Sequence, residues 1–134
     1  MAMAVRVHQT GGPEVLTYEA VDVAAPGKGE VRVRHHAIGV NFIDVYFRTG
    51  LYPAPTTPFI VGHEAAGEVV DVGPGVTDFH RGDRVAYYHG PGTYVTERVI
   101  PASLAVKLPD ALSYEQAAAI LLKGLTAHYL LHTT

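Results

Sequence analysis

Frequent glycine and proline residues are the feature that most limits what this chain can fold into. The chain has 134 residues, of which 14 are glycine and 9 are proline, about one residue in six. Because both residue types interrupt regular secondary structure, their spacing favours many short strands over long helices. Hydrophobic residues make up 48% of the chain and charged residues 17%, so a buried core is expected. Together these features predict a globular, mainly β domain.

Alternation of apolar and polar residues marks the segments between these breaks as strands. The clearest case is residues 30–38, where the two kinds alternate with a period of two, as in a half-buried strand. The same pattern, in shorter form, predicts strands over residues 4–8, 15–23, 68–73, 84–88, 93–100 and 104–108. Three prolines between residues 51 and 58 predict a loop.

Two helices are predicted, and they differ in character. Asn41 can cap a short helix that carries Asp44 in its first turn and ends at Gly50. A capping box formed by Ser113 and Gln116 begins a second helix, which is apolar on nearly every side. Since such a helix is normally buried on most sides, we expect another part of a longer protein, or another chain, to cover it.

Composition excludes several classes of function. The absence of cysteine excludes a disulfide scaffold, a cysteine-ligated zinc site, an iron–sulfur cluster and a cysteine nucleophile. A formal net charge of −3 disfavours binding to nucleic acid. No apolar stretch is as long as a membrane span and no signal peptide opens the chain, so a cytoplasmic protein without a membrane partner is expected. No glycine-rich phosphate-binding motif is present.

The pair His63–Glu64, which lies between two glycines, is the strongest single candidate for chemistry. It could be a metal ligand beside its supporting carboxylate, or His63 could simply hydrogen-bond the backbone. The other candidates also have a structural explanation when each is taken alone: Asp44 as a helix cap, Tyr46 and Tyr52 as core or loop aromatics, and Thr126 and Tyr129 as helix polarity. Residue chemistry alone leaves these alternatives open.

Six ordered segments resemble the N-terminal part of the quinone oxidoreductases, the zinc-less branch of the medium-chain dehydrogenase/reductase superfamily that includes the zeta-crystallins. The matching segments are GGPEVL at 11–16, AIGVNFID at 37–44, RTGLYP at 48–53, GHEAAG at 62–67, GDRV at 82–85, and QAAA through KGLT at 116–126. One such segment would be weak evidence. Six in order over nearly the whole chain form a specific resemblance.

This resemblance implies an architecture. Residues 1–112 would form a GroES-like, partly open β-barrel with short helices, the N-terminal catalytic domain of the family. Residues 113–134 would form a connecting helix toward a cofactor-binding Rossmann domain that is absent from this sequence. The longer protein would be a homodimer, and the 134 residues alone are expected to be inactive.

The resemblance also implies a chemistry, namely zinc-independent hydride transfer from NADPH to a quinone. In the zinc-dependent relatives a cysteine stands at the position of Asn41, so no metal is expected here and His63 would be a retained position without a metal. Asn41, Tyr46 and Tyr52 would orient the substrate. Residues near the nicotinamide would be Asn41, Phe42, Ile43, Asp44, Val45, Tyr46, Thr126 and Tyr129.

Two alternatives remain at this point. An enoyl or alkene reductase of the same superfamily would use the same fold and cofactor. A non-enzymatic GroES-like binding module would use the barrel alone, since a fold does not specify a function.

Overall fold

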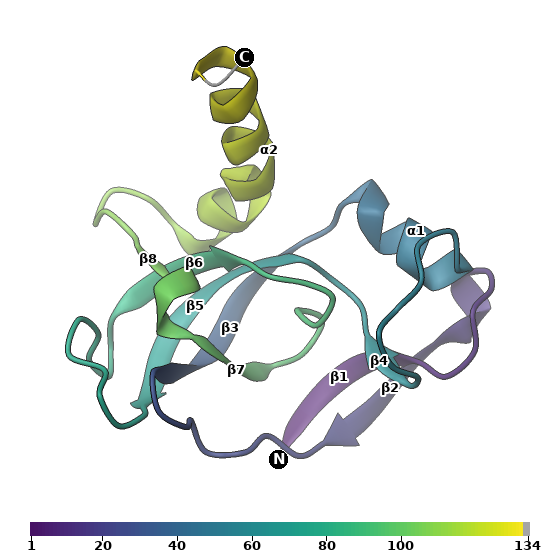
Figure 1. Ribbon diagram of the computed structural model, residues 1–134, viewed down its shortest axis with the longest axis horizontal. Coiled ribbons are helices and arrows are strands. Elements are labelled where there is room, and N and C mark those ends of the chain that lie inside the picture. Colours follow the sequence, from purple (N-terminus) through teal and green to yellow (C-terminus); the bar gives the residue numbers. More distant parts are fainter. Residues whose placement is uncertain (133–134) are drawn as a thin grey trace.

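The computed structural model describes residues 1–132, over which two antiparallel sheets and two α-helices form the chain (Figure 1). One sheet has the strand order β2-β1-β4, with β1 at Ala2–Val7, β2 at Leu16–Val21 and β4 at Phe59–Ile60. The other has the order β7-β3-β5-β6-β8, with β3 at Glu30–Gly39, β5 at Glu64–Val72, β6 at Arg84–Tyr88, β7 at Glu97–Pro101 and β8 at Val106–Lys107. The helices are α1 at Phe42–Thr49 and α2 at Tyr114–His132. The predicted mainly β fold with few helices is confirmed.

The segment before β7 joins the two sheets. Val95 forms an isolated bridge with Ala4 of β1. The backbone N–H of Val5 donates to the carbonyl of Tyr94 over 2.8 Å, and that of Thr96 donates to the carbonyl of Met3 over 2.9 Å. The predicted strand over residues 93–100 is therefore divided between the two sheets.

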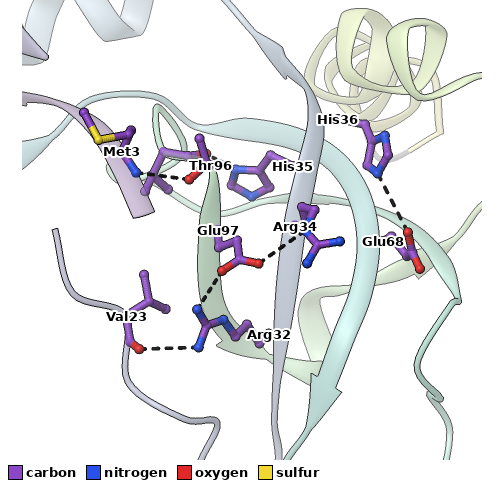
Figure 2. A network of polar contacts seen from close by, with 10 residues as sticks. Met3, Val23, Arg32, Arg34, His35, His36, Glu68, Thr96 and Glu97 are labelled. Atoms are coloured by element: carbon purple, nitrogen blue, oxygen red, sulfur yellow. Dashed lines mark hydrogen bonds and ion pairs between the residues drawn. The ribbon is translucent and has the colours of Figure 1, made fainter. Parts of the chain in front are cut away.

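Strand β3 shows the predicted alternation. Val31 and Val33 are fully buried in the main core, with Val69, Val85, Tyr87 and Ile100 around them. On the opposite face Arg32 and Arg34 donate to Glu97 of β7 over 2.6 and 3.3 Å, as Figure 2 shows. The hydrogen bond from Arg32 is the main cause that lowers the pKa of Glu97. This ion-paired group supports the register in which Arg34 lies opposite Glu97.

Several strands differ from the prediction. A 3-10 turn at Pro13–Val15 shortens the strand expected over residues 15–23, because Pro13 favours the first position of a turn. Strand β4 was not predicted, since it is only two residues long. Strand β5 begins at Glu64 and not at residue 68, because the first half of this strand is buried on both faces and lacks alternation. Ala65 packs into the main core, whereas Ala66 packs against Ala117 and Ala118 of α2.

Helix α2 begins at the predicted capping box and is mostly uncovered within residues 1–132. Gln116 N–H donates to Ser113 Oγ over 3.1 Å, and Ser113 N–H donates to Gln116 Oε1 over 2.9 Å. Only Ala117 and Ala118 are buried, because the first turns alone lie on the five-stranded sheet and the rest stands away from the strands (Figure 1). Ile120, Leu125 and Tyr129 are exposed. The last two residues of the predicted segment 113–134 lie outside the described residues.

Within residues 1–132 no helix is both long and apolar enough to cross a membrane.

Two glycine substitutions should affect stability in opposite directions. A Cβ at Gly67 would meet the Arg34 carbonyl of the neighbouring strand well inside van der Waals contact, so Gly67→Ala should lower the free energy of unfolding by about 1–3 kcal/mol. Gly124 lies in the exposed part of α2 with open space around it, so Gly124→Ala should raise that free energy by about 0.5–1 kcal/mol. Urea unfolding followed by circular dichroism measures both. A neutral Gly67→Ala would contradict the close packing of β3 on β5.

Candidate functional site

Helix α1 presents the residues that the sequence singled out. Asn41 precedes the helix in an extended conformation, and Asp44 Oδ2 accepts its backbone N–H over 3.0 Å. Gly50 ends the helix with a φ of 87°, a left-handed conformation that glycine adopts at little cost. The predicted helix, its first-turn carboxylate and its stop are confirmed.

Asp44 does more than cap α1. It is buried, and its Oδ1 accepts a hydrogen bond from His63 Nδ1 over 2.8 Å. Its Oδ2 also accepts from the Tyr94 hydroxyl over 2.7 Å. Burial, followed by the hydrogen bond to Asp44, raises the pKa of Tyr94, so this hydroxyl stays protonated as a donor. The three side chains join α1, the start of β5 and the segment before β7.

The hydrogen bond of His63 differs from the one expected for a purely structural histidine. The sequence allows a backbone partner for its ring, but the ring bonds the side-chain carboxylate of Asp44. Phe47 and Tyr88 flank the ring, with centroid distances of 5.0 and 6.0 Å. Among residues 1–132 no group of three or more histidine, aspartate or glutamate side chains could hold a metal ion.

A second polar cluster lies where α1, β5 and α2 meet. Asn41 Nδ2 donates to Glu64 Oε1 over 2.7 Å, and Lys123 Nζ donates to Asn41 Oδ1 over 3.3 Å. The other Glu64 oxygen accepts the backbone N–H of Leu122 over 2.7 Å. Asn41 therefore sits between a fully buried carboxylate and an exposed ammonium group.

Lys123 borders two hollows, and Asn41 borders one of them. One, of about 280 Å³, is lined by Val40, Asn41, Phe42, Val45 and Lys123. The other, of about 460 Å³, shares Val40 and Lys123 with it and reaches Glu64. Apolar walls with a few convergent polar groups are typical of ligand sites.

The remaining predicted site residues do not line these two hollows. The rings of Tyr46 and Tyr52 form a T-shaped contact with a centroid distance of 5.3 Å, and both are partly exposed. Ile43 is partly buried on α1. Thr126 donates to the Leu122 carbonyl of its own helix over 3.0 Å, and Tyr129 is exposed one turn further on. Their contacts with a ligand stay predictions.

Sequence reasoning gave no role to Tyr94 or Lys123, and it considered Glu64 only as the carboxylate that supports a metal ligand at His63. A signal existed for two of them. Glu64 is a charged residue within a small, apolar segment, and Lys123 is the one aspartate, glutamate, lysine or arginine between positions 117 and 131. Tyr94 had no signal, since its partner Asp44 is 50 residues away.

The Asp44 cluster should be sensitive to loss of an acceptor. In Asp44→Asn one oxygen becomes an NH₂ group that faces donors, so the free energy of unfolding should fall by about 1–3 kcal/mol. Asp78→Asn, on an exposed loop, is the matched control and should change it by less than about 0.5 kcal/mol. Urea unfolding compares the two variants. Equal losses of unfolding free energy in the two variants would show that the hydrogen bonds of Asp44 do not stabilise the fold.

Comparisons with known proteins agree with this arrangement. The chain is 54% identical to a quinone oxidoreductase of Pseudomonas aeruginosa over the whole chain and 42% of that relative. It is 48% identical to a 2-haloacrylate reductase of a Burkholderia species, again over the whole chain and 42% of the relative. A crystal structure of Escherichia coli quinone oxidoreductase complexed with NADPH superimposes with a TM-score of 0.91 and 46% identity, over 97% of this chain and 40% of that one.

The chain thus spans about two fifths of the length of these relatives, and the resemblance to quinone oxidoreductases is confirmed. The profile of the alcohol dehydrogenase GroES-like domain matches residues 27–110, which is more than half of the chain. This match includes α1, β5 and the Asp44 cluster. The chain therefore belongs to the alcohol dehydrogenase GroES-like domain family.

Proposed function

We propose that this chain forms the substrate-side part of an NADPH-dependent quinone oxidoreductase that works without zinc. The observation that carries the proposal is the meeting of Asn41 and Lys123, 82 residues apart, at an apolar hollow lined by Phe42 and Val45. The similarity to the quinone oxidoreductases of Pseudomonas aeruginosa and Escherichia coli supports it, the latter having been solved with NADPH.

The hollow suits one end of a nicotinamide cofactor. Its walls of Val40, Phe42 and Val45 can contact a flat ring, and Asn41 and Lys123 can donate hydrogen bonds to an oxygen. No glycine-rich turn for the phosphates is present in the sequence. We therefore assign phosphate binding to a further domain, with residues 1–112 as the substrate-side domain and residues 113–134 as the connecting helix. Thr126 and Tyr129, further along this helix, would contact the cofactor near the nicotinamide.

The chain's own residues would orient the reactants and exclude water. NADPH, when bound, supplies the hydride. Phe42 and Val45 shield the reacting atoms from solvent, and the Lys123 ammonium with the Asn41 amide stabilises the oxygen that becomes negative during reduction. The proton for that oxygen can come from water. The exposed rings of Tyr46 and Tyr52 offer apolar faces to a planar quinone.

A second candidate activity is reduction of an activated alkene. The similarity to the 2-haloacrylate reductase favours it, since the same donors could bind the oxygen of an unsaturated acid or ketone. Quinone reduction remains the main proposal because two of the three relatives reported above carry that name. A homodimer and a cytoplasmic location, both implied by resemblance, are proposed for the longer protein.

An activity assay tests the proposal. The longer protein that contains this chain should oxidise NADPH, followed at 340 nm, when naphthoquinone is added. The present chain alone should show no turnover and weak NADPH binding in isothermal titration. Assays with 2-chloroacrylate and an α,β-unsaturated ketone separate the second candidate. No NADPH oxidation with any of several quinones would overturn the main proposal.

Chelation tests independence from zinc. Asn41 stands where zinc-dependent relatives have a cysteine, and His63 Nδ1 is already bonded to Asp44. Prolonged dialysis against o-phenanthroline should therefore leave the reductase activity of the longer protein unchanged, whereas a zinc-dependent alcohol dehydrogenase treated in parallel should lose its own. Activity that is lost and then restored by Zn²⁺ would contradict this expectation.

A further inference from the structure

Glu64 is a fully buried carboxylate for which the proposed function has so far given no role. Burying an ionised group is costly unless it is bonded to donors, so its partners need an explanation. Both partners are donors: the Asn41 side-chain amide on one oxygen and the Leu122 backbone N–H on the other, each over 2.7 Å. The carboxylate thus uses both of its oxygens as acceptors, one toward α1 and one toward α2.

The surrounding backbone leaves space for this arrangement. A Cβ at Gly39, on the neighbouring strand β3, would collide with the Glu64 side chain and with the Ala118 carbonyl of α2. Glycine at this position therefore lets the carboxylate reach the helix backbone. The contact is built into the packing of β3, β5 and α2.

The two charges on either side of Asn41 decide how its amide is oriented. The NH₂ and oxygen ends of an asparagine amide have nearly the same shape, and either can point in a given direction unless hydrogen bonds choose. Here the carboxylate of Glu64 accepts only and the ammonium of Lys123 donates only, so the NH₂ must face Glu64 and the oxygen must face Lys123. The reversed amide would place NH₂ against the ammonium and oxygen against the carboxylate.

We propose that Glu64 is a positioning residue, which fixes the Asn41 amide so that its second N–H and the Lys123 ammonium together face the oxygen of a bound carbonyl group. This inference rests on the proposed function and deepens it, since the oxygen would belong to the nicotinamide carboxamide or to the substrate. The residue acts through Asn41 and does not itself contact the ligand. A neutral glutamine at position 64 has one acceptor for two donors, so it removes one of the two contacts that orient the amide.

The test compares Glu64→Gln with Glu68→Gln in the longer protein. Glu68 lies on the same strand, is partly exposed and pairs with His36 at 3.9 Å, so it is a matched loss of one negative charge away from Asn41. Glu64→Gln should lower kcat by on the order of tenfold or more, as expected when a hydrogen bond to a charged group is lost. The primary isotope effect with 4-deuterated NADPH should rise, while KM for NADPH should change little. Glu68→Gln should match the parent protein in all three quantities.

A second variant keeps the test decisive if Glu64→Gln fails to fold. Lys123 is exposed, so Lys123→Met should fold normally and remove the other charge that orients the amide. Because the Lys123 ammonium is itself proposed to face the reacting oxygen, the readout for this variant is the ¹⁵N signal of the Asn41 side chain, which should change at unchanged unfolding stability. If the parent protein is active and both variants equal Glu68→Gln, the inference is wrong although the proposed function holds.

If the parent protein shows no reductase activity, the proposed function fails and the inference is judged by spectroscopy. In protein labelled with ¹⁵N-asparagine, the Asn41 side-chain protons should be shifted downfield and exchange slowly with solvent. Glu64→Gln should abolish both signatures and Glu68→Gln should leave them unchanged. Identical Asn41 signals in the two variants would overturn the inference.

Discussion

The first half of strand β5 is enclosed on both faces, and the rest of the described structure is arranged around this constraint. One face contributes Ala65 and Val69 to the main core with Val31 and Tyr87. The other face contributes Ala66, against which Ala117 and Ala118 of α2 pack. Small residues on both sides let a helix backbone approach a sheet closely. The beginning of the strand is thereby removed from water, together with the polar side chain of Glu64 and that of His63, which directly precedes the strand.

Two buried carboxylates follow from that enclosure, and each is bonded by donors from several elements. Asp44 accepts from His63, Tyr94 and the Asn41 backbone, and Glu64 accepts from the Asn41 amide and from Leu122. Buried charges of this kind add little net stability, because desolvation offsets the attraction. Removing a partner is costly, however, so such groups restrict the chain to one arrangement. Asn41 belongs to both clusters: its backbone N–H bonds Asp44 and its side-chain amide bonds Glu64. These two contacts together restrict its position.

The parts of the fold that depend on local pattern could be predicted, and the parts that depend on distant partners could not. Alternation over residues 30–38 is a local property and marks β3 correctly, as do Gly50 and the Ser113–Gln116 box for the helix ends. The start of β5 escaped prediction because burial on both faces removes the alternation. In the candidate site, Asn41 was found through its resemblance to a family, but its partners Glu64 and Lys123 lie 23 and 82 residues away. The pairing of β3 with β5 places Asn41 near Glu64, and the packing of α2 on β5 adds Lys123.

The position of α2 therefore matters to the site as well as to the core. Leu122 and Lys123, which bond Glu64 and Asn41, are consecutive residues of this helix, and they lie just beyond its buried turns. A small shift of the helix would lengthen both the Leu122–Glu64 and the Lys123–Asn41 hydrogen bonds. The orientation of the Asn41 amide therefore depends on the position of α2. The exposed apolar residues Ile120 and Leu125 flank them on the same helix. Under the proposed function, a further domain that packs against them would contact the same helix that bonds Glu64 and Asn41.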